Sequence, residues 1–233
     1  VITGCLKIAK ESIFTGTNNF VSNTITSSRL NEYYGFVQSE VDRILEDAEI
    51  KDKGDVMKKW YDGYHFGDVD VYCPWDVMCY VDDLQKNPDA KPDEYWKDTS
   101  DNAIIRSFID YAGASITKKL ETLMNGGYIV QRVDENLTYD YLHSSEENLW
   151  SLMYLTGYLT QVRDYKIDDG WQDNMVALKI PNLEIKQIFE TEVSKWFEDS
   201  SKKWNRTELF SSVWNEDCDK ITKEVSALLR RTI

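Results

Sequence analysis

The sequence has few of the residues that catalytic and metal sites usually need. Its 233 residues include two histidines, His65 and His143, and neither accompanies a serine or cysteine nucleophile in a recognisable elbow motif. The four cysteines lie far apart, without the paired short spacing of a zinc or redox site, so we interpret them as reduced, partly buried thiols. The sequence therefore predicts no catalytic residues and no metal site in this chain.

Long apolar runs and phosphate-binding loops are also missing. The longest apolar run, residues 149–159, is too short to cross a bilayer, and the first residues lack the order of a signal peptide. We expect a cytoplasmic protein with no membrane contact. Residues 124–128 contain two glycines but neither the lysine nor the hydroxyl residue of a Walker loop, so the chain alone is predicted to bind no ATP and no other cofactor.

Two segments partly match known metal-binding motifs, but each lacks ligands that the motif requires. Residues 164–173 are rich in aspartate, but Tyr165 and Ile167 stand where a calcium loop needs ligands. A metal-dependent nuclease places a carboxylate and then a lysine on one strand, and the run Ala177-Leu178-Lys179 lacks the carboxylate. A solvated acidic loop followed by an ordinary strand is the interpretation that remains.

The composition that is present predicts an acidic globular protein. Hydrophobic residues make up 42% of the chain and include eight tryptophans, enough to build a substantial core. Acidic residues outnumber basic ones by 41 to 27, which gives a formal net charge of -14. Such a surface repels phosphate backbones, so the charge argues against direct nucleic-acid binding by this chain.

Apolar periodicity predicts a mainly α protein with small β elements, an α+β fold. Helices are expected near residues 41–48, 57–61, 74–84, 102–111, 117–124, 149–159, 182–197 and 218–228, and strands near 1–8, 69–72, 128–133, 160–166 and 175–180. Gly126-Gly127 is expected to stop one helix, Ser144 with Glu147 to form a capping box, and Asn182 to cap another helix. His65 is interpreted as a packed turn residue. Val77, Met78, Val81 and Leu84 are the apolar residues that follow Pro74 in the helix expected to begin there.

Residues 149–197 follow the order helix, hairpin, helix. This order matches a winged-helix-like module if residues 117–124 supply the helix that normally comes first. The helix over 182–197 mixes Glu184, Glu190 and Glu192 with two lysines, so it lacks the basic face of a DNA-reading helix.

Several aromatic and glycine motifs together resemble one protein family. The motifs are Ile2-Thr3-Gly4, Lys10-Glu11-Ser12-Ile13-Phe14, Asn18-Asn19, Trp60-Tyr61-Asp62-Gly63-Tyr64-His65-Phe66-Gly67, Tyr72-Cys73-Pro74-Trp75, Tyr95-Trp96, Leu149-Trp150-Ser151 and Thr156-Gly157-Tyr158-Leu159-Thr160. Together they resemble the bacterial AAA-ATPase-like proteins that often end in a PD-(D/E)XK nuclease domain. The resemblance runs through almost the whole chain.

The resemblance implies that this chain is a middle third of such a protein. Residues 1–35 would be the last strand and a loop of the P-loop ATPase core, and residues 36–115 the helical lid. Residues 116–200 would be the winged-helix-like domain, and residues 201–233 would be C-terminal helices leading to a further domain. The Walker motifs, bound ATP and magnesium, and the nuclease residues would all belong to polypeptide outside this chain.

The resemblance also implies two groups of site residues. Thr3, with Lys7 and Lys10, would sense the terminal phosphate of the nucleotide, and an ordinary strand-end turn is the alternative. Trp60, Tyr61, Gly63, Tyr64, Phe66 and Gly67 would pack the lid against the nucleotide domain, and simple core packing is the alternative for Trp60.

The leading functional interpretation is a lid and winged-helix-like portion that relays nucleotide state to an attached domain and is inactive alone. Its partners would be the N-terminal P-loop domain and the C-terminal nuclease-like domain. An acidic protein-interaction module without nucleotide chemistry is the alternative, in which the surface of the helix over 183–197 binds a protein partner. A third hypothesis is a hydrolase with an unfamiliar active site. Measured ATP turnover by this chain would favour that hypothesis.

Overall fold

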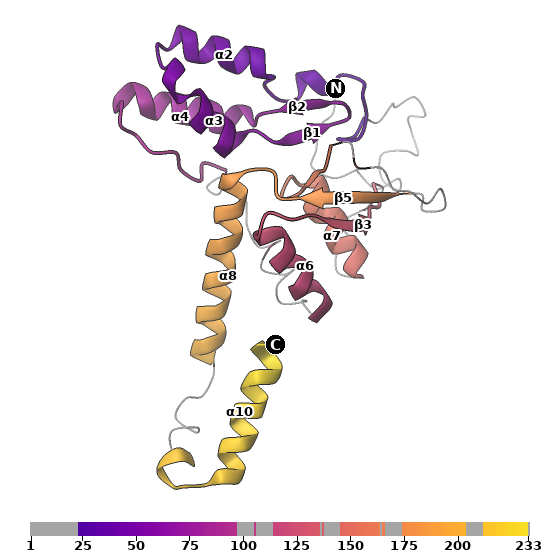
Figure 1. Ribbon diagram of the computed structural model, residues 1–233, viewed down its shortest axis with the longest axis vertical. Coiled ribbons are helices and arrows are strands. Elements are labelled where there is room, and N and C mark those ends of the chain that lie inside the picture. Colours follow the sequence, from indigo (N-terminus) through magenta and orange to yellow (C-terminus); the bar gives the residue numbers. More distant parts are fainter. Residues whose placement is uncertain are drawn as a thin grey trace, which may run out of the picture.

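The computed structural model describes residues 23–96, 105, 114–135, 137, 145–163, 165, 174–203 and 212–232. Within them the protein is mainly helical, with a two-stranded and a three-stranded sheet, as the sequence predicts. The predicted strand at residues 1–8, the predicted sensor residues Thr3, Lys7 and Lys10, and most of the predicted helix 102–111 lie outside the described residues. In Figure 1, α2 to α4 lie at one end and the larger sheet in the middle, and α8 projects away from the sheet.

The first half of the described chain is built from short helices and a hairpin. It comprises η1 (Asn31–Tyr33), α2 (Gln38–Asp47), η2 (Lys51–Lys53), α3 (Gly54–Tyr61), β1 (Tyr64–Phe66), β2 (Val69–Val71) and α4 (Pro74–Lys86). Strands β1 and β2 are antiparallel, and Gly67 makes the turn between them with φ of 57°. Pro74 occupies the first turn of α4, as predicted, because its missing N–H would have no partner there.

A first hydrophobic cluster joins α2, α3 and α4. Its buried members are Val41, Leu45, Met57, Tyr61, Tyr72, Val77, Tyr80, Val81 and Leu84. Of the apolar residues that follow Pro74, Val77, Val81 and Leu84 are buried together with Tyr80, whereas Met78 is 48% exposed. Residues 77, 80, 81 and 84 share one side of a helix, whereas residue 78 is turned about 100° from residue 77.

The larger sheet contains β3 (Ile129–Arg132), β5 (Met175–Lys179) and β4 (Thr160–Gln161), in that order. Both pairings are antiparallel, with Val130 opposite Ala177 and Thr160 opposite Lys179. The predicted pairing of the 160–166 and 175–180 segments is therefore confirmed, although β4 is shorter than expected. The tip between them lies mostly outside the described residues.

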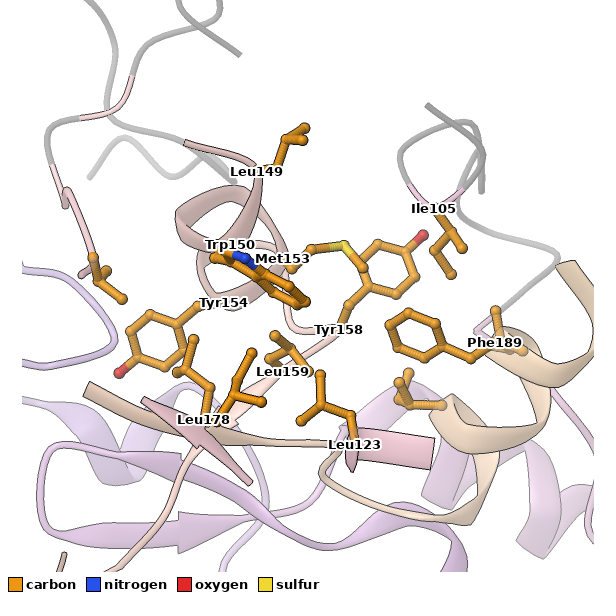
Figure 2. Close-up of a cluster of buried hydrophobic side chains, with 14 of the residues drawn as sticks. Ile105, Leu123, Leu149, Trp150, Met153, Tyr154, Tyr158, Leu159, Leu178 and Phe189 are labelled. Carbon is orange, nitrogen blue, oxygen red and sulfur yellow. The ribbon is translucent and has the colours of Figure 1, made fainter. Parts of the chain in front are cut away.

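Helix α7 (Glu146–Leu155) lies at the centre of a second, larger cluster, as its apolar sequence predicts. Figure 2 shows its side chains among those of the sheet and α8; the labelled residues are Ile105, Leu123, Leu149, Trp150, Met153, Tyr154, Tyr158, Leu159, Leu178 and Phe189. The predicted cap is one residue out of register: Ser145, not Ser144, is the N-cap, and its Oγ accepts a hydrogen bond from Asn148 N at 3.2 Å. The helix ends before Gly157, whose φ is 89°.

Three further helices complete the described chain. Helix α6 (Ala114–Met124) stops at Gly126, which has φ of 81°, so the predicted glycine stop is confirmed. Helix α8 (Leu183–Lys203) begins after Asn182, the predicted cap, whose Oδ1 accepts a hydrogen bond from Ile185 N at 3.0 Å. Helix α10 (Cys218–Thr232) follows near the C-terminus. Among the described helices, none has the length and apolarity to span a bilayer.

Candidate functional site

Two of the sequence blocks meet in space. The aromatic block (residues 60–67) ends in β1, and the threonine block (residues 156–160) runs from the end of α7 into β4. The backbone N–H of His65 donates a hydrogen bond to Thr160 Oγ1 at 2.9 Å, and Tyr64 is buried in the α7 cluster. Tyr158 of the threonine block packs edge-on against Trp96 with 4.8 Å between ring centroids. We call this region, with the start of α8, the junction.

At Gly63, the backbone of the junction lies very close to the backbone of Pro181. This glycine has φ of 101°, and a Cβ atom placed on it would lie 2.3 Å from the carbonyl oxygen of Pro181. A distance below 3.0 Å to a backbone atom leaves no room for a side chain, so only glycine fits here. The end of α3 at Tyr61, followed by Asp62-Gly63, therefore also allows the close approach between the end of α3 and the start of α8.

The side-chain amide of Asn182 stabilises the same close approach between the end of α3 and the start of α8. Its Oδ1 caps α8, while its Nδ2 donates a hydrogen bond to the carbonyl oxygen of Asp62 at 3.0 Å. A single side chain thus satisfies a helix N-terminus and a carbonyl at the end of α3.

Replacing Asn182 with alanine is expected to lower the free energy of unfolding by about 2 kcal/mol, because a cap and a cross-junction hydrogen bond are lost together. Ser145→Ala is the matched control, since Ser145 caps α7 with no described bond across the junction. We expect that control to cost about 1 kcal/mol in urea denaturation followed by tryptophan fluorescence. Equal losses in the two variants would show that the bond to Asp62 contributes nothing.

A charged group flanks the junction. Asp70 of β2 accepts from His65 Nδ1 at 2.8 Å and from Arg163, which follows β4. Partial burial raises the pKa of Asp70, but the hydrogen bonds from Arg163 and His65 outweigh it and hold the pKa below its usual value. The interpretation of His65 as a turn residue is wrong, since it lies in β1, although it is well packed with a side chain 12% exposed.

Two carboxyl groups are buried together under the junction. Asp76, in the first turn of α4, and Glu184, in the first turn of α8, are both 0% exposed, and their side chains interact. Glu184 Oε1 accepts from the backbone N–H of Trp96 at 2.8 Å. Asp76 Oδ1 and Oδ2 and Glu184 Oε2 accept no hydrogen bond of ordinary length from the described residues, and the nearby Cys73 thiol is only a weak donor to Asp76. A proton retained on one carboxyl supplies the missing donor.

Burial and the neighbouring Asp76 charge raise the pKa of Glu184 to about 9, and burial raises that of Asp76 as well. The pair therefore holds a proton at neutral pH. Two carboxyls alone are a poor metal site, and no group of three or more histidine, cysteine or acidic side chains in the described part of the chain could hold a metal ion.

The predicted lid-packing residues fall in both clusters. Tyr61 is fully buried in the α2–α4 cluster, where its hydroxyl donates to Asp93 O at 3.1 Å, and Trp60 is half-buried beside it. Tyr64 is buried in the α7 cluster, and Phe66 packs against that cluster. A Cβ on Gly67 would lie 2.8 Å from Ser27 O. Their proposed contact with a nucleotide domain stays a prediction, as do the sensor roles of Thr3, Lys7 and Lys10.

Sequence reasoning missed Asp76 and Glu184. Each is an acidic residue in the first turn of a helix, a common and unremarkable position because it complements the helix dipole. The signal available was that each follows a helix-start residue, Pro74 or Asn182. Nothing local indicates that the two helix starts meet.

Comparison with known proteins gives one distant relative. No family model matches the chain, and no solved structure matches it. A protein of Azotobacter chroococcum mcd 1, described as an uncharacterized protein in the vnfD 5′ region, is 26% identical over 186 residues, which cover 80% of this chain and 32% of that protein. The chain therefore spans about a third of the length of this relative.

Proposed function

We propose that this chain is the lid and winged-helix-like portion of an AAA-ATPase-like protein, and that it relays nucleotide state to an attached nuclease-like domain. The observation that carries the proposal is the junction, where the aromatic and threonine blocks of the family resemblance meet. Its contacts join the α2–α4 cluster to the α7 cluster through backbone atoms and buried side chains. A displacement of the helical part would reach the sheet through these contacts.

The order of elements supports the winged-helix-like part of the proposal. Helix α6, strand β3, helix α7 and the β4–β5 pair follow one another, and β5 lies between the other two strands. Helix α7 would be the counterpart of a DNA-reading helix, but its residues 149–154 are all buried. A helix enclosed in this way has no free face for a DNA groove, which favours a mechanical over a DNA-reading role.

Calorimetry and hydrogen exchange would test the proposal. The chain alone is expected to show no magnesium-dependent ATP binding, and a longer polypeptide that includes an upstream P-loop is expected to bind ATP. In that polypeptide, ATP should change amide protection at residues 60–67 and 156–163. Tight ATP binding by the isolated chain would contradict the assignment, and unchanged protection at the junction would contradict the relay.

A second candidate function is an acidic interaction module without nucleotide chemistry. The exposed Val213 and Trp214, which are 51% and 89% exposed, favour it together with the net charge of -14. A longer polypeptide without any glycine-rich Lys-Ser or Lys-Thr loop would support this candidate over the first.

A further inference from the structure

A short segment before η1 lies across the turn of the β1–β2 hairpin. We call residues 24–29 the strap. The backbone N–H of Gly67, in the hairpin turn, donates a hydrogen bond to Ile25 O at 2.8 Å, and a Cβ atom on Gly67 would lie 2.8 Å from Ser27 O. The strap therefore lies backbone to backbone on the hairpin turn, at a position where only glycine leaves room for it.

Glu135, in the loop after β3, ties the strap to the larger sheet. Thr24 Oγ1 donates a hydrogen bond to Glu135 Oε2 at 3.1 Å, and Thr26 Oγ1 donates to Glu135 Oε1 at 2.8 Å. Hydrogen bonds to a carboxylate are stronger than those between neutral groups. Glu135 is half-buried, and both of its carboxylate oxygens accept from the strap. We call these two bonds the clamp.

The strap has little apolar packing of its own. Its sequence is Thr-Ile-Thr-Ser-Ser-Arg, and Ile25, its one apolar residue, packs against the α7 cluster. Ser28 and Arg29 are exposed. Segments with few buried apolar contacts open at a lower free energy than the protein as a whole. Among the described contacts, the clamp and the bond from Gly67 are therefore the main ties that hold the strap in place.

Leu30, which follows the strap, has a strained backbone. Its φ of 63° and ψ of 14° lie in the left-handed region, which is unfavourable for a residue other than glycine, asparagine or aspartate. The Leu30 side chain is 45% exposed, so its own packing does little to hold this conformation. The next residue is fixed, because Asn31 is buried and its Nδ2 donates to Phe66 O at 2.9 Å. Such strain persists only where the surrounding contacts impose it, here the clamp on one side and Asn31 on the other.

We propose that the strap is a releasable tie, which the clamp holds down against the strain at Leu30. In its docked state the strap fixes the hairpin turn to the loop after β3. In its released state residues 24–29 lift about Leu30 while Asn31 stays bound, and the hairpin remains attached to the sheet through the junction.

The place of the strap in the chain suggests how it is used. It follows directly on residues 1–22, so a pull along the chain reaches the clamp before the other described contacts. This use of the strap in a relay rests on the proposed function, whereas its release does not.

Amide hydrogen exchange of the 233-residue chain, followed by NMR in low concentrations of urea, tests the proposal. The Gly67 N–H reports on the strap, and the Tyr72 N–H, which donates to Phe36 O at 2.8 Å, reports on the hairpin. Lifting of the strap exposes little surface, so exchange at Gly67 should be nearly independent of urea and, relative to the intrinsic rates, at least about tenfold faster than at Tyr72. The same urea dependence at both amides would overturn the proposal, because the strap would then leave only when the whole protein unfolds.

Removing the clamp should favour release. Thr24→Val with Thr26→Val replaces both hydroxyls by methyl groups of similar size and should raise exchange at Gly67 about tenfold, still independent of urea. Glu147→Gln is the matched control, since Glu147 is exposed in the first turn of α7, and it should leave exchange at Gly67 unchanged. If the double variant does not fold, Glu135→Gln decides, and its weaker acceptor should raise exchange about threefold. A folded clamp variant with the exchange rate of the wild type would overturn the clamp.

Leu30→Asn should act in the opposite direction, because asparagine adopts the left-handed conformation more easily than leucine. Leu30→Ala is its control, since alanine removes most of the side chain but keeps the strain. We expect exchange at Gly67 to be about threefold slower in Leu30→Asn than in Leu30→Ala. Equal exchange in the two variants would overturn the role of Leu30. These measurements use no nucleotide, so their outcome is separate from that of the ATP experiments on the relay.

Discussion

Gly63→Ala is expected to lower the free energy of unfolding by about 4 kcal/mol. Two costs add at this position. A φ of 101° lies outside the regions that residues with a side chain occupy, which costs about 1–3 kcal/mol. The new methyl group would also lie 2.3 Å from Pro181 O, and relieving this contact requires backbone movement that costs a similar amount. Urea denaturation followed by tryptophan fluorescence measures the sum.

Gly126→Ala separates the two costs. Gly126 has φ of 81°, and nothing lies within 4 Å of a Cβ placed there. Its replacement should therefore cost only the conformational strain, about 1–2 kcal/mol. The difference between the two variants then measures the close approach at the junction. If Gly63→Ala costs no more than Gly126→Ala, the end of α3 and the start of α8 are not held together as described.

The junction result also bears on the proposed relay. If backbone contact at Gly63 transmits movement between the helical part and the sheet, then Gly63→Ala should reduce the nucleotide-dependent protection changes at residues 156–163 in a longer, ATP-binding polypeptide. Gly126→Ala leaves the junction intact and should preserve them. Stability and transmission can thus be separated by the same pair of variants.

Features that depend on neighbouring residues could be predicted from the sequence. Asn182 caps α8 because a side-chain carbonyl two or three residues before a helical N–H is in reach whatever the fold. Gly126 ends α6 because glycine, which has no Cβ, adopts the left-handed conformation with the lowest conformational energy. The apolar run around Trp150 had to be buried on all sides, since no polar face was left to meet solvent.

Features that depend on packing between distant segments could not be predicted. The choice of Ser145 over Ser144 as N-cap moves a helix start by one residue, and both serines satisfy the local pattern. The exposure of Met78 depends on which side of α4 meets α2 and α3. The pairing of Asp76 with Glu184 depends on two helix starts meeting, which no spacing in the chain encodes.

Glu184→Gln is expected to stabilise the protein at alkaline pH and to reduce the pH dependence of its unfolding. The folded pKa of Glu184, about 9, lies above its ordinary value of 4.5. Between these values the folded state binds more protons than the unfolded state, so stability is greatest at the acidic end and falls as pH rises. One proton accounts for at most about 1.4 kcal/mol per pH unit, so the wild type should lose about 2 kcal/mol between pH 6 and pH 8.

Glutamine removes this loss because its amide donates to Asp76 without a titrating proton. The groups around the pair, Cys73, Tyr61, Tyr64 and Glu94, stay in place in the variant, so the difference between the two unfolding curves isolates Glu184. Glu190→Gln is the matched control, since Glu190 is exposed on the same helix, and it should leave the slope unchanged. Denaturation midpoints measured from pH 5 to pH 9 test this expectation. Parallel curves for wild type and Glu184→Gln would mean that the buried pair holds no proton in the folded protein.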